Sequence, residues 1–177
     1  MIKLHSLGIL TLLIGLIGLT GCTGAPYRMG TASLYPQDIQ TIYVPMIESD
    51  SFRPFLGERL TEAVTRRISD GTTFTLVNDP NADSVLSVRL VSDTKRLLVE
   101  NVFDDPRESQ INMQVLVSWT TRRGELIRES SMPLPQAIDI GASSDIVPEF
   151  GRSMATAQQE VIDRLANQIV GMMEVPW

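Results

Sequence analysis

The sequence predicts a two-layer α+β domain, in which two amphipathic helices cover one face of a mainly antiparallel or mixed sheet of about four strands. Two segments, at 85–99 and 109–121, alternate apolar and polar residues as half-buried strands do. Two others, at 52–69 and 153–173, repeat apolar residues at helical spacing. The resulting element order, β-α-β-β-β-α, is typical of helices packed on one side of an antiparallel sheet.

The first strand is expected at 39–46, where β-branched and aromatic residues are concentrated. Pro45 has no N–H to donate to a ladder, so the strand should end there or lie at an edge. On this strand the residues that would share one face are Ile42, Val44 and Met46.

The helix predicted at 52–69 follows this strand. Pro54 suits its first turn, and Gly71 offers a left-handed residue at its end. Its apolar stripe is formed by Phe52, Leu56, Leu60, Ala63, Val64 and Ile68.

The central strands form an antiparallel meander with short connections. A short extra strand at 73–77 precedes the long strand at 85–99, and a polar turn at 104–107 leads into the strand at 109–121. A further strand is expected at 125–132. The core-facing residues are expected to be Leu86, Val88, Leu90, Ile111, Met113, Val115, Val117 and Trp119. Asn112, Gln114 and Ser118 then make the other face polar and open to solvent or to a partner.

The stretch 132–150 holds three Pro and one Gly, which indicates a surface excursion. The final helix is predicted from Ser153 to Met173, because its apolar residues recur at helical spacing and need a packing partner. These are Met154, Ala157, Val161, Leu165, Ile169 and Met172, widened by Ile162, Ala166 and Met173.

Residues 1–21 have the organisation of an export signal. A short start with Lys3 precedes an apolar run at 7–19, which is shorter than the roughly 20 residues of a membrane span. The run ends in Leu19-Thr20-Gly21-Cys22, which resembles a bacterial lipobox and makes Cys22 the predicted lipid-attachment residue. The alternatives are a plain signal peptide or an N-terminal membrane helix with an incidental Cys.

Three regions follow from this reading: a lipoprotein signal peptide at 1–21, a tether at 22–38 and one α+β domain at 39–177. Tyr27, Leu34 and Tyr35 are available to dock the tether on the domain. Thr23, which is not Asp, favours the outer membrane by analogy with lipoprotein sorting in enteric bacteria.

Composition excludes several classes of function. The 177 residues include one Cys, Cys22, and one His, His5, and neither lies in the predicted domain. The domain therefore has no ligands for a Cys/His zinc site and no imidazole base for a catalytic triad. The net charge of −6 disfavours nonspecific binding to nucleic acid. No calcium-loop spacing or phosphate-binding glycine motif is present, so we expect no metal, no cofactor and no enzymatic activity.

Four segments together suggest a family. They are Ser33-Leu34-Tyr35-Pro36, the strand 39–46, the helical Leu60-Thr61-Glu62-Ala63-Val64 and the run 79–86. Over about residues 27–130 the chain resembles the lipopolysaccharide-assembly lipoprotein family (LptE), particularly its divergent non-enteric members. The resemblance implies an outer-membrane lipoprotein, anchored at the periplasmic face through Cys22, that plugs the LptD β-barrel and helps insert lipopolysaccharide into the outer leaflet.

Lys95, Arg96 and Arg107 lie near the tip of the long predicted hairpin and are the candidate lipopolysaccharide contacts, since guanidinium and ammonium groups pair with phosphate. The alternative is a solvated charged turn, because acidic residues are close by in sequence. Arg122 and Arg123, at the opposite end of the strand, are interpreted as ordinary turn charges. An alternative function is an envelope lipoprotein that regulates another machine, such as a cell-wall synthase or a secretion channel.

Overall fold

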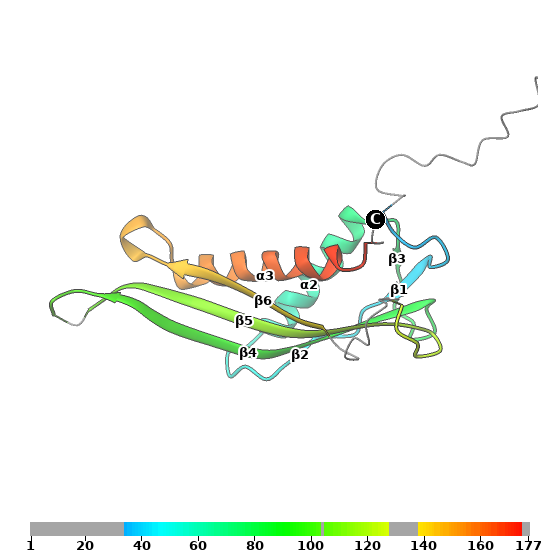
Figure 1. Ribbon diagram of the computed structural model, residues 1–177, viewed down its shortest axis with the longest axis horizontal. Helices are drawn as coiled ribbons and strands as arrows, with labels where there is room; N and C mark the ends of the chain where they lie inside the picture. Colours follow the sequence, from blue (N-terminus) through cyan, green and yellow to red (C-terminus); the bar gives the residue numbers. More distant parts are fainter. Residues whose placement is uncertain (1–33, 104, 128–137, 175–177) are drawn as a thin grey trace, which may run out of the picture. The chain divides into compact units, whose positions relative to one another are not determined.

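The computed structural model describes residues 34–103, 105–127 and 138–174, which belong to one compact unit spanning Thr31–Trp177. One mixed sheet carries two helices on one of its faces (Figure 1). The α+β class predicted from the sequence is confirmed, although the sheet has six strands where about four were expected. The predicted signal peptide, Cys22 and most of the tether, including Tyr27, lie outside the described residues.

The sheet order is β3-β1-β4-β5-β6, and β2 pairs with β4 farther along the same edge as β1. β1, β2 and β3 make parallel pairs, whereas β4, β5 and β6 are antiparallel. In chain order the elements are β1 Thr41–Tyr43, β2 Glu48–Ser49, α2 Leu56–Gly71, β3 Thr75–Leu76, β4 Ser84–Glu100, β5 Pro106–Thr121, β6 Ile138–Ile146, the 3₁₀ helix η3 Pro148–Phe150 and α3 Met154–Gly171.

The hairpin of β4 and β5 dominates the sheet. Its register pairs Leu86 with Trp119 and Leu90 with Val115, and these four side chains are buried under the helices. Cross-strand partners share a face, so the predicted alternation is confirmed on both strands. The opposite face, here called the open face, carries the more exposed residues Ser87, Arg89, Asn112, Gln114, Leu116 and Ser118.

The two helices pack on each other and on the sheet. The stripe predicted for the last helix is confirmed, with Val161, Leu165 and Ile169 buried, while Met154 and Met172 are only partly buried. The Oγ of Ser153 caps α3 by accepting a hydrogen bond from the Thr156 N–H at 3.2 Å, which satisfies one of the free donors of the first turn.

The first helix begins later than the spacing predicts. α2 starts at Leu56, so Phe52 is fully exposed and Pro54 precedes the helix, and both predictions were wrong. Gly71 is the last helical residue and has no left-handed conformation, since the cap is the extended Thr72. On the preceding segment, β1 ends at Tyr43 and Met46 is exposed, contrary to its predicted place beside Ile42.

The third antiparallel strand is also not where the pattern placed it. The described part of 125–132 makes only a bridge between Leu126 and Thr120, and residues 128–132 lie outside the described residues. The strand beside β5 is instead β6, within the predicted surface excursion, so that prediction was wrong. The inward positions of β6 do alternate, with Ile138, Ile140, Ala142 and Ile146, but the small Ala142 and the buried Ser144 weaken the apolar pattern.

The start of the described chain is held by aromatic contacts. Tyr35 is buried and stacks edge-on against Phe74, with ring centroids 5.3 Å apart, and Phe74 meets Trp119 in the same way at 5.9 Å. Burial also raises the pKa of the Tyr35 hydroxyl. The docking predicted for Leu34 and Tyr35 is confirmed, and so is the core position of Trp119.

Gly57 allows the chain before α2 to approach the helix closely. A Cβ at this position would lie 2.2 Å from the carbonyl oxygen of Ile47. Gly57→Ala is therefore expected to lower the free energy of unfolding by roughly 1–3 kcal/mol, measured by urea denaturation.

Gly71→Ala is the matched control in the same helix, because its new methyl group would meet only Arg67 side-chain atoms at 3.7 Å or more. It should leave stability unchanged or raise it by about 0.5–1 kcal/mol. Equal stability of Gly57→Ala and the parent chain would contradict the close approach.

Candidate binding surfaces

The hairpin is much longer than the helix layer. β5 has 16 residues, which at a rise of about 3.4 Å extend over about 54 Å, or less where the strand twists. α3 has 18 residues, which at 1.5 Å per residue span about 27 Å. The helices therefore leave one end of the hairpin uncovered, and β4 is exposed from Thr94 to Glu100 (Figure 1).

The structure places all three predicted lipopolysaccharide contacts on this uncovered end. Lys95 pairs with Ile111 and so lies on the helix side, whereas Arg96 pairs with Gln110 on the open face. Arg107 forms an ion pair with Glu149 of η3. The three side chains therefore do not converge on one point, and Arg107 is already neutralised by a neighbour.

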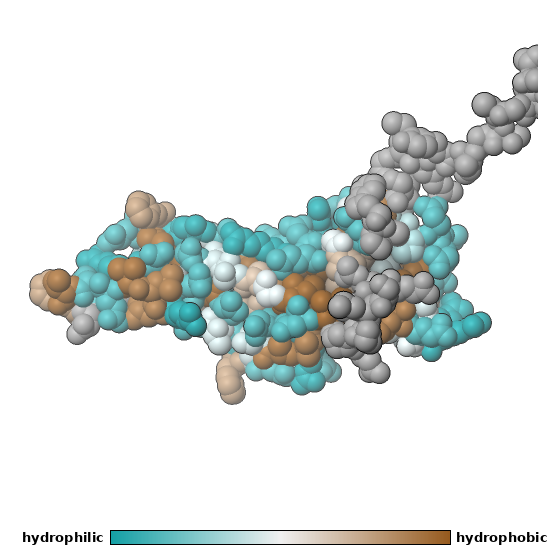
Figure 2. All heavy atoms as spheres, viewed as in Figure 1, coloured by the Kyte–Doolittle hydropathy of each residue, from teal (hydrophilic) through white to brown (hydrophobic). Residues whose placement is uncertain are grey.

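Apolar side chains are concentrated at the same end, a feature that the sequence interpretation missed. Val102 and Phe103 in the turn are 90% and 81% exposed, and Phe150 of η3 is 82% exposed. Figure 2 shows the brown surface of this end. The available signal was the run Leu97, Leu98 and Val99, which breaks the alternation and leaves each side chain close to half exposed.

Residues 50–55 carry a second pair of exposed aromatic side chains, Phe52 and Phe55. Phe55 has a φ of 62°, a left-handed conformation that is costly for a bulky residue. The loop is fixed by Asp93, whose side chain is 1% exposed and accepts hydrogen bonds from Ser51 Oγ at 2.9 Å and from Arg53 Nη1 at 3.0 Å. These contacts hold two aromatic rings in solvent on a rigid loop.

The open face of the sheet is polar along most of its length. Gln110 donates a hydrogen bond to Asp145 at 2.9 Å, and Arg89 donates two to Asp50 at 2.9 and 3.2 Å. Its large exposed apolar residues include Leu116 and, at the uncovered end, Val99, which pairs with Glu108. Such a surface suits hydrated surroundings, as the sequence predicts for this face.

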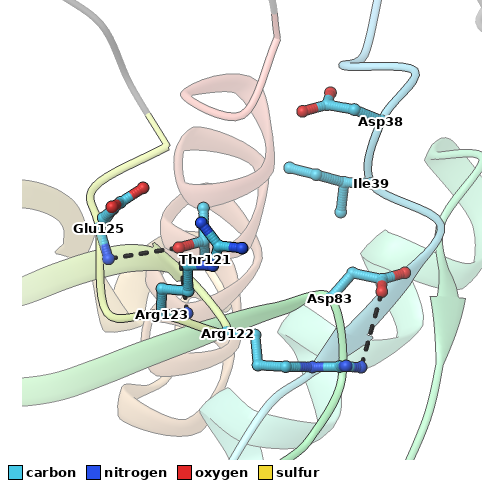
Figure 3. Close-up of a pocket in the computed structure, with 7 residues that line it drawn as sticks. All are labelled: Asp38, Ile39, Asp83, Thr121, Arg122, Arg123 and Glu125. Atoms are coloured by element: carbon cyan, nitrogen blue, oxygen red, sulfur yellow. Dashed lines mark hydrogen bonds and ion pairs between the residues drawn. The ribbon is translucent and has the colours of Figure 1, made fainter.

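A cleft of about 490 Å³ lies at the other end of the sheet, around Arg122 and Arg123 (Figure 3). Asp83 Oδ1 is 3.8 Å from Arg122 Nη2. Hydrogen bonds from the side chain and backbone of Thr41 lower the pKa of Asp83. Since Asp38 and Glu125 also line the cleft, its carboxylates outnumber its guanidinium groups and it is a poor anion site.

No group of three or more acidic, Cys or His residues is placed to hold a metal ion among residues 34–103, 105–127 and 138–174. In the same residues no helix has the length and apolar character needed to cross a membrane.

The domain thus combines a helix-covered core with a projecting hairpin that carries exposed apolar and cationic side chains. The lipopolysaccharide-assembly family, LptE, matches residues 39–173, and the chain belongs to this family. The family is one of non-enzymatic lipoproteins that act in lipopolysaccharide assembly. No curated protein matches the sequence significantly.

Similar solved structures come from several bacteria. Protein XCC0632 from Xanthomonas campestris is 11% identical with a TM-score of 0.55, and 82% of this chain and 89% of that chain are covered. Hypothetical protein CT253 from Chlamydia trachomatis is 14% identical with a TM-score of 0.51, covering 76% and 95%. Lipoprotein B from Nitrosomonas europaea is 16% identical with a TM-score of 0.49, covering 85% and 92%. At these identities the first two comparisons show the fold alone.

Proposed function

We propose that this chain is a non-enzymatic subunit that plugs an LptD-like outer-membrane β-barrel and assists the insertion of lipopolysaccharide into the outer leaflet. The observation that supports it most is the one-sided sheet, whose inner face is buried by α2 and α3 while its open face stays polar. The interior walls of large outer-membrane barrels are polar and hydrated. A polar face of this kind can lie against such a wall because both surfaces can keep their bound water and hydrogen bonds.

The proposal includes an anchor at Cys22, which becomes the first residue after cleavage of residues 1–21. Diacylglycerol on the Cys22 thiol and a further acyl chain on the Cys22 α-amine hold the chain at the periplasmic face of the outer membrane. Each buried CH₂ contributes about 0.8 kcal/mol, so two or three acyl chains give lasting attachment. The tether then lets the domain reach the barrel.

The lipid contact is assigned to the cations of the hairpin. Lys95 and Arg96 project to opposite faces of the two strands, so they can hold phosphate groups on either side of the hairpin. Arg107 contributes when a phosphate replaces Glu149 as its partner, since both are anions of suitable geometry. The action is binding alone, which separates aggregated lipopolysaccharide molecules by competing for their phosphates.

Cys22→Ala tests the anchor. The variant is expected to accumulate as an uncleaved or soluble species, because the atom that accepts diacylglycerol is gone. Fractionation of cells into outer-membrane and soluble material, with mass spectrometry of the N-terminus, measures the result. Mature Cys22→Ala in the membrane fraction at the parent level would contradict lipid attachment at this residue.

The double variant Lys95→Glu/Arg96→Glu tests the lipid contact. Its affinity for purified lipopolysaccharide is expected to fall about tenfold, because two charge-assisted contacts become repulsive. Binding of fluorescent lipopolysaccharide to the detergent-solubilised full chain gives the affinity.

Arg66→Glu/Arg123→Glu is the control, since it changes the net charge equally at exposed positions away from the hairpin end. Equal affinity losses in the two double variants would show a net-charge effect and would contradict a site at Lys95 and Arg96.

A further inference from the structure

Two distant segments build the apolar end of the hairpin. The turn that joins β4 to β5 carries Val102 and Phe103, and η3 follows β6 after Ile146, which is paired with Ser109. The ion pair between Arg107 and Glu149 joins η3 to the start of β5, next to this turn. Phe103 and Phe150 are thus presented at one end of the molecule by elements about 50 residues apart in the chain.

The turn is fixed by its own hydrogen bonds. The side-chain oxygen of Asn101 accepts from the N–H groups of Phe103 at 2.8 Å and Asp105 at 2.9 Å, and the Asn101 N–H donates to the Asp105 carbonyl at 3.0 Å. A turn with this bonding presents Val102 and Phe103 in a defined geometry. Rigid exposed aromatic side chains of this kind are typical of the residues that carry binding energy at protein interfaces.

The charges beside these side chains decide what the end can meet. Between Arg96 and Arg107 the chain has three acidic residues, Glu100, Asp104 and Asp105, and no basic residue. Arg107 itself is paired with Glu149. The apolar end is therefore flanked by uncompensated negative charge, while Lys95 and Arg96 lie farther back on β4.

An acidic flank disfavours insertion into a lipid surface. Lipid phosphates and anionic headgroups attract basic segments and repel carboxylates, so an apolar wedge for a membrane is expected to carry Lys or Arg at its border. The charge pattern here is the reverse. It is complementary to an apolar pocket bordered by Lys or Arg on a protein.

We propose that the hairpin end, formed by Val102, Phe103 and Phe150 with Glu100 and Asp105 at its border, docks into an apolar pocket with a basic rim on a partner protein. This inference rests on the proposed function for the existence of a protein partner. It adds that the tip of the hairpin contacts protein, whereas Lys95 and Arg96 behind it contact lipid. Phe103 fills the pocket, and the two carboxylates pair with the rim.

The test places a photo-crosslinker at the tip of the full, membrane-anchored chain in cells. Phe103→p-benzoylphenylalanine is expected to give an adduct with one protein, at an apolar peptide that lies beside Lys or Arg residues. Adding Glu100→Lys is expected to lower the adduct yield about fivefold, because the rim then meets a like charge. Glu58→Lys, an exposed charge reversal on α2, is the matched control and should leave the yield unchanged.

Three results would overturn the inference: a lipid adduct in place of a protein adduct, a yield no higher than that of Arg123→p-benzoylphenylalanine at the opposite turn, or a yield unaffected by Glu100→Lys. Binding of the purified full chain to vesicles of phosphatidylethanolamine, phosphatidylglycerol and lipopolysaccharide is a second readout. Loss of this binding in Phe103→Ser would also overturn the inference.

The outcomes separate this inference from the proposed function. A basic-rimmed pocket on a protein that is not an outer-membrane barrel would support the docking inference and sink the barrel assignment. A barrel that copurifies with the chain but gives no adduct at position 103 would support the barrel assignment and contradict the docking inference.

Discussion

The mismatch in length between the β4–β5 hairpin and the helices is the constraint on which the rest of the structure depends. Pairing runs from Ser84 with Thr121 to Glu100 with Pro106, whereas α3 spans only about half of that length. The burial of the side chains follows this mismatch. β5 is buried at alternate positions from Ser109 to Trp119, whereas β4 is exposed beyond Asp93. One half of the hairpin belongs to the core, and the other half is exposed and is the surface that we propose for binding.

Polar contacts fix the edges of this core. Glu160 of α3 accepts a hydrogen bond from the buried Ser144 of β6 at 2.7 Å and pairs with Arg152 and Arg164. The Ser144 hydrogen bond is the main cause of the lowered pKa of Glu160. At the opposite edge Asp93 holds the loop before α2. Both contacts lie where the helix layer stops, so they define where the free end of the hairpin begins.

The sequence predicted the parts of the fold whose residue types report burial directly. Leu86 to Leu90, Ile111 to Trp119 and the stripe of α3 all show their period in apolar residues. β6 shows this period only in part, since Ala142 is small and Ser144 interrupts it, and Pro133, Pro135 and Pro148 favoured a loop. The late start of α2 depends on the approach of Ile47 to Gly57. Likewise, the hairpin cations were predicted from one segment, but the pairing of Arg107 with Glu149 joins residues 42 apart.

The central claim is that this chain, a member of the lipopolysaccharide-assembly family, works as the accessory subunit of an outer-membrane barrel. Purification of the tagged full chain from outer membranes in mild detergent, with quantitative mass spectrometry of what accompanies it, tests this most directly. The account predicts one large β-barrel protein in about equal amount, together with lipopolysaccharide. A cell-wall synthase or secretion channel in its place, with no barrel present, would contradict the account.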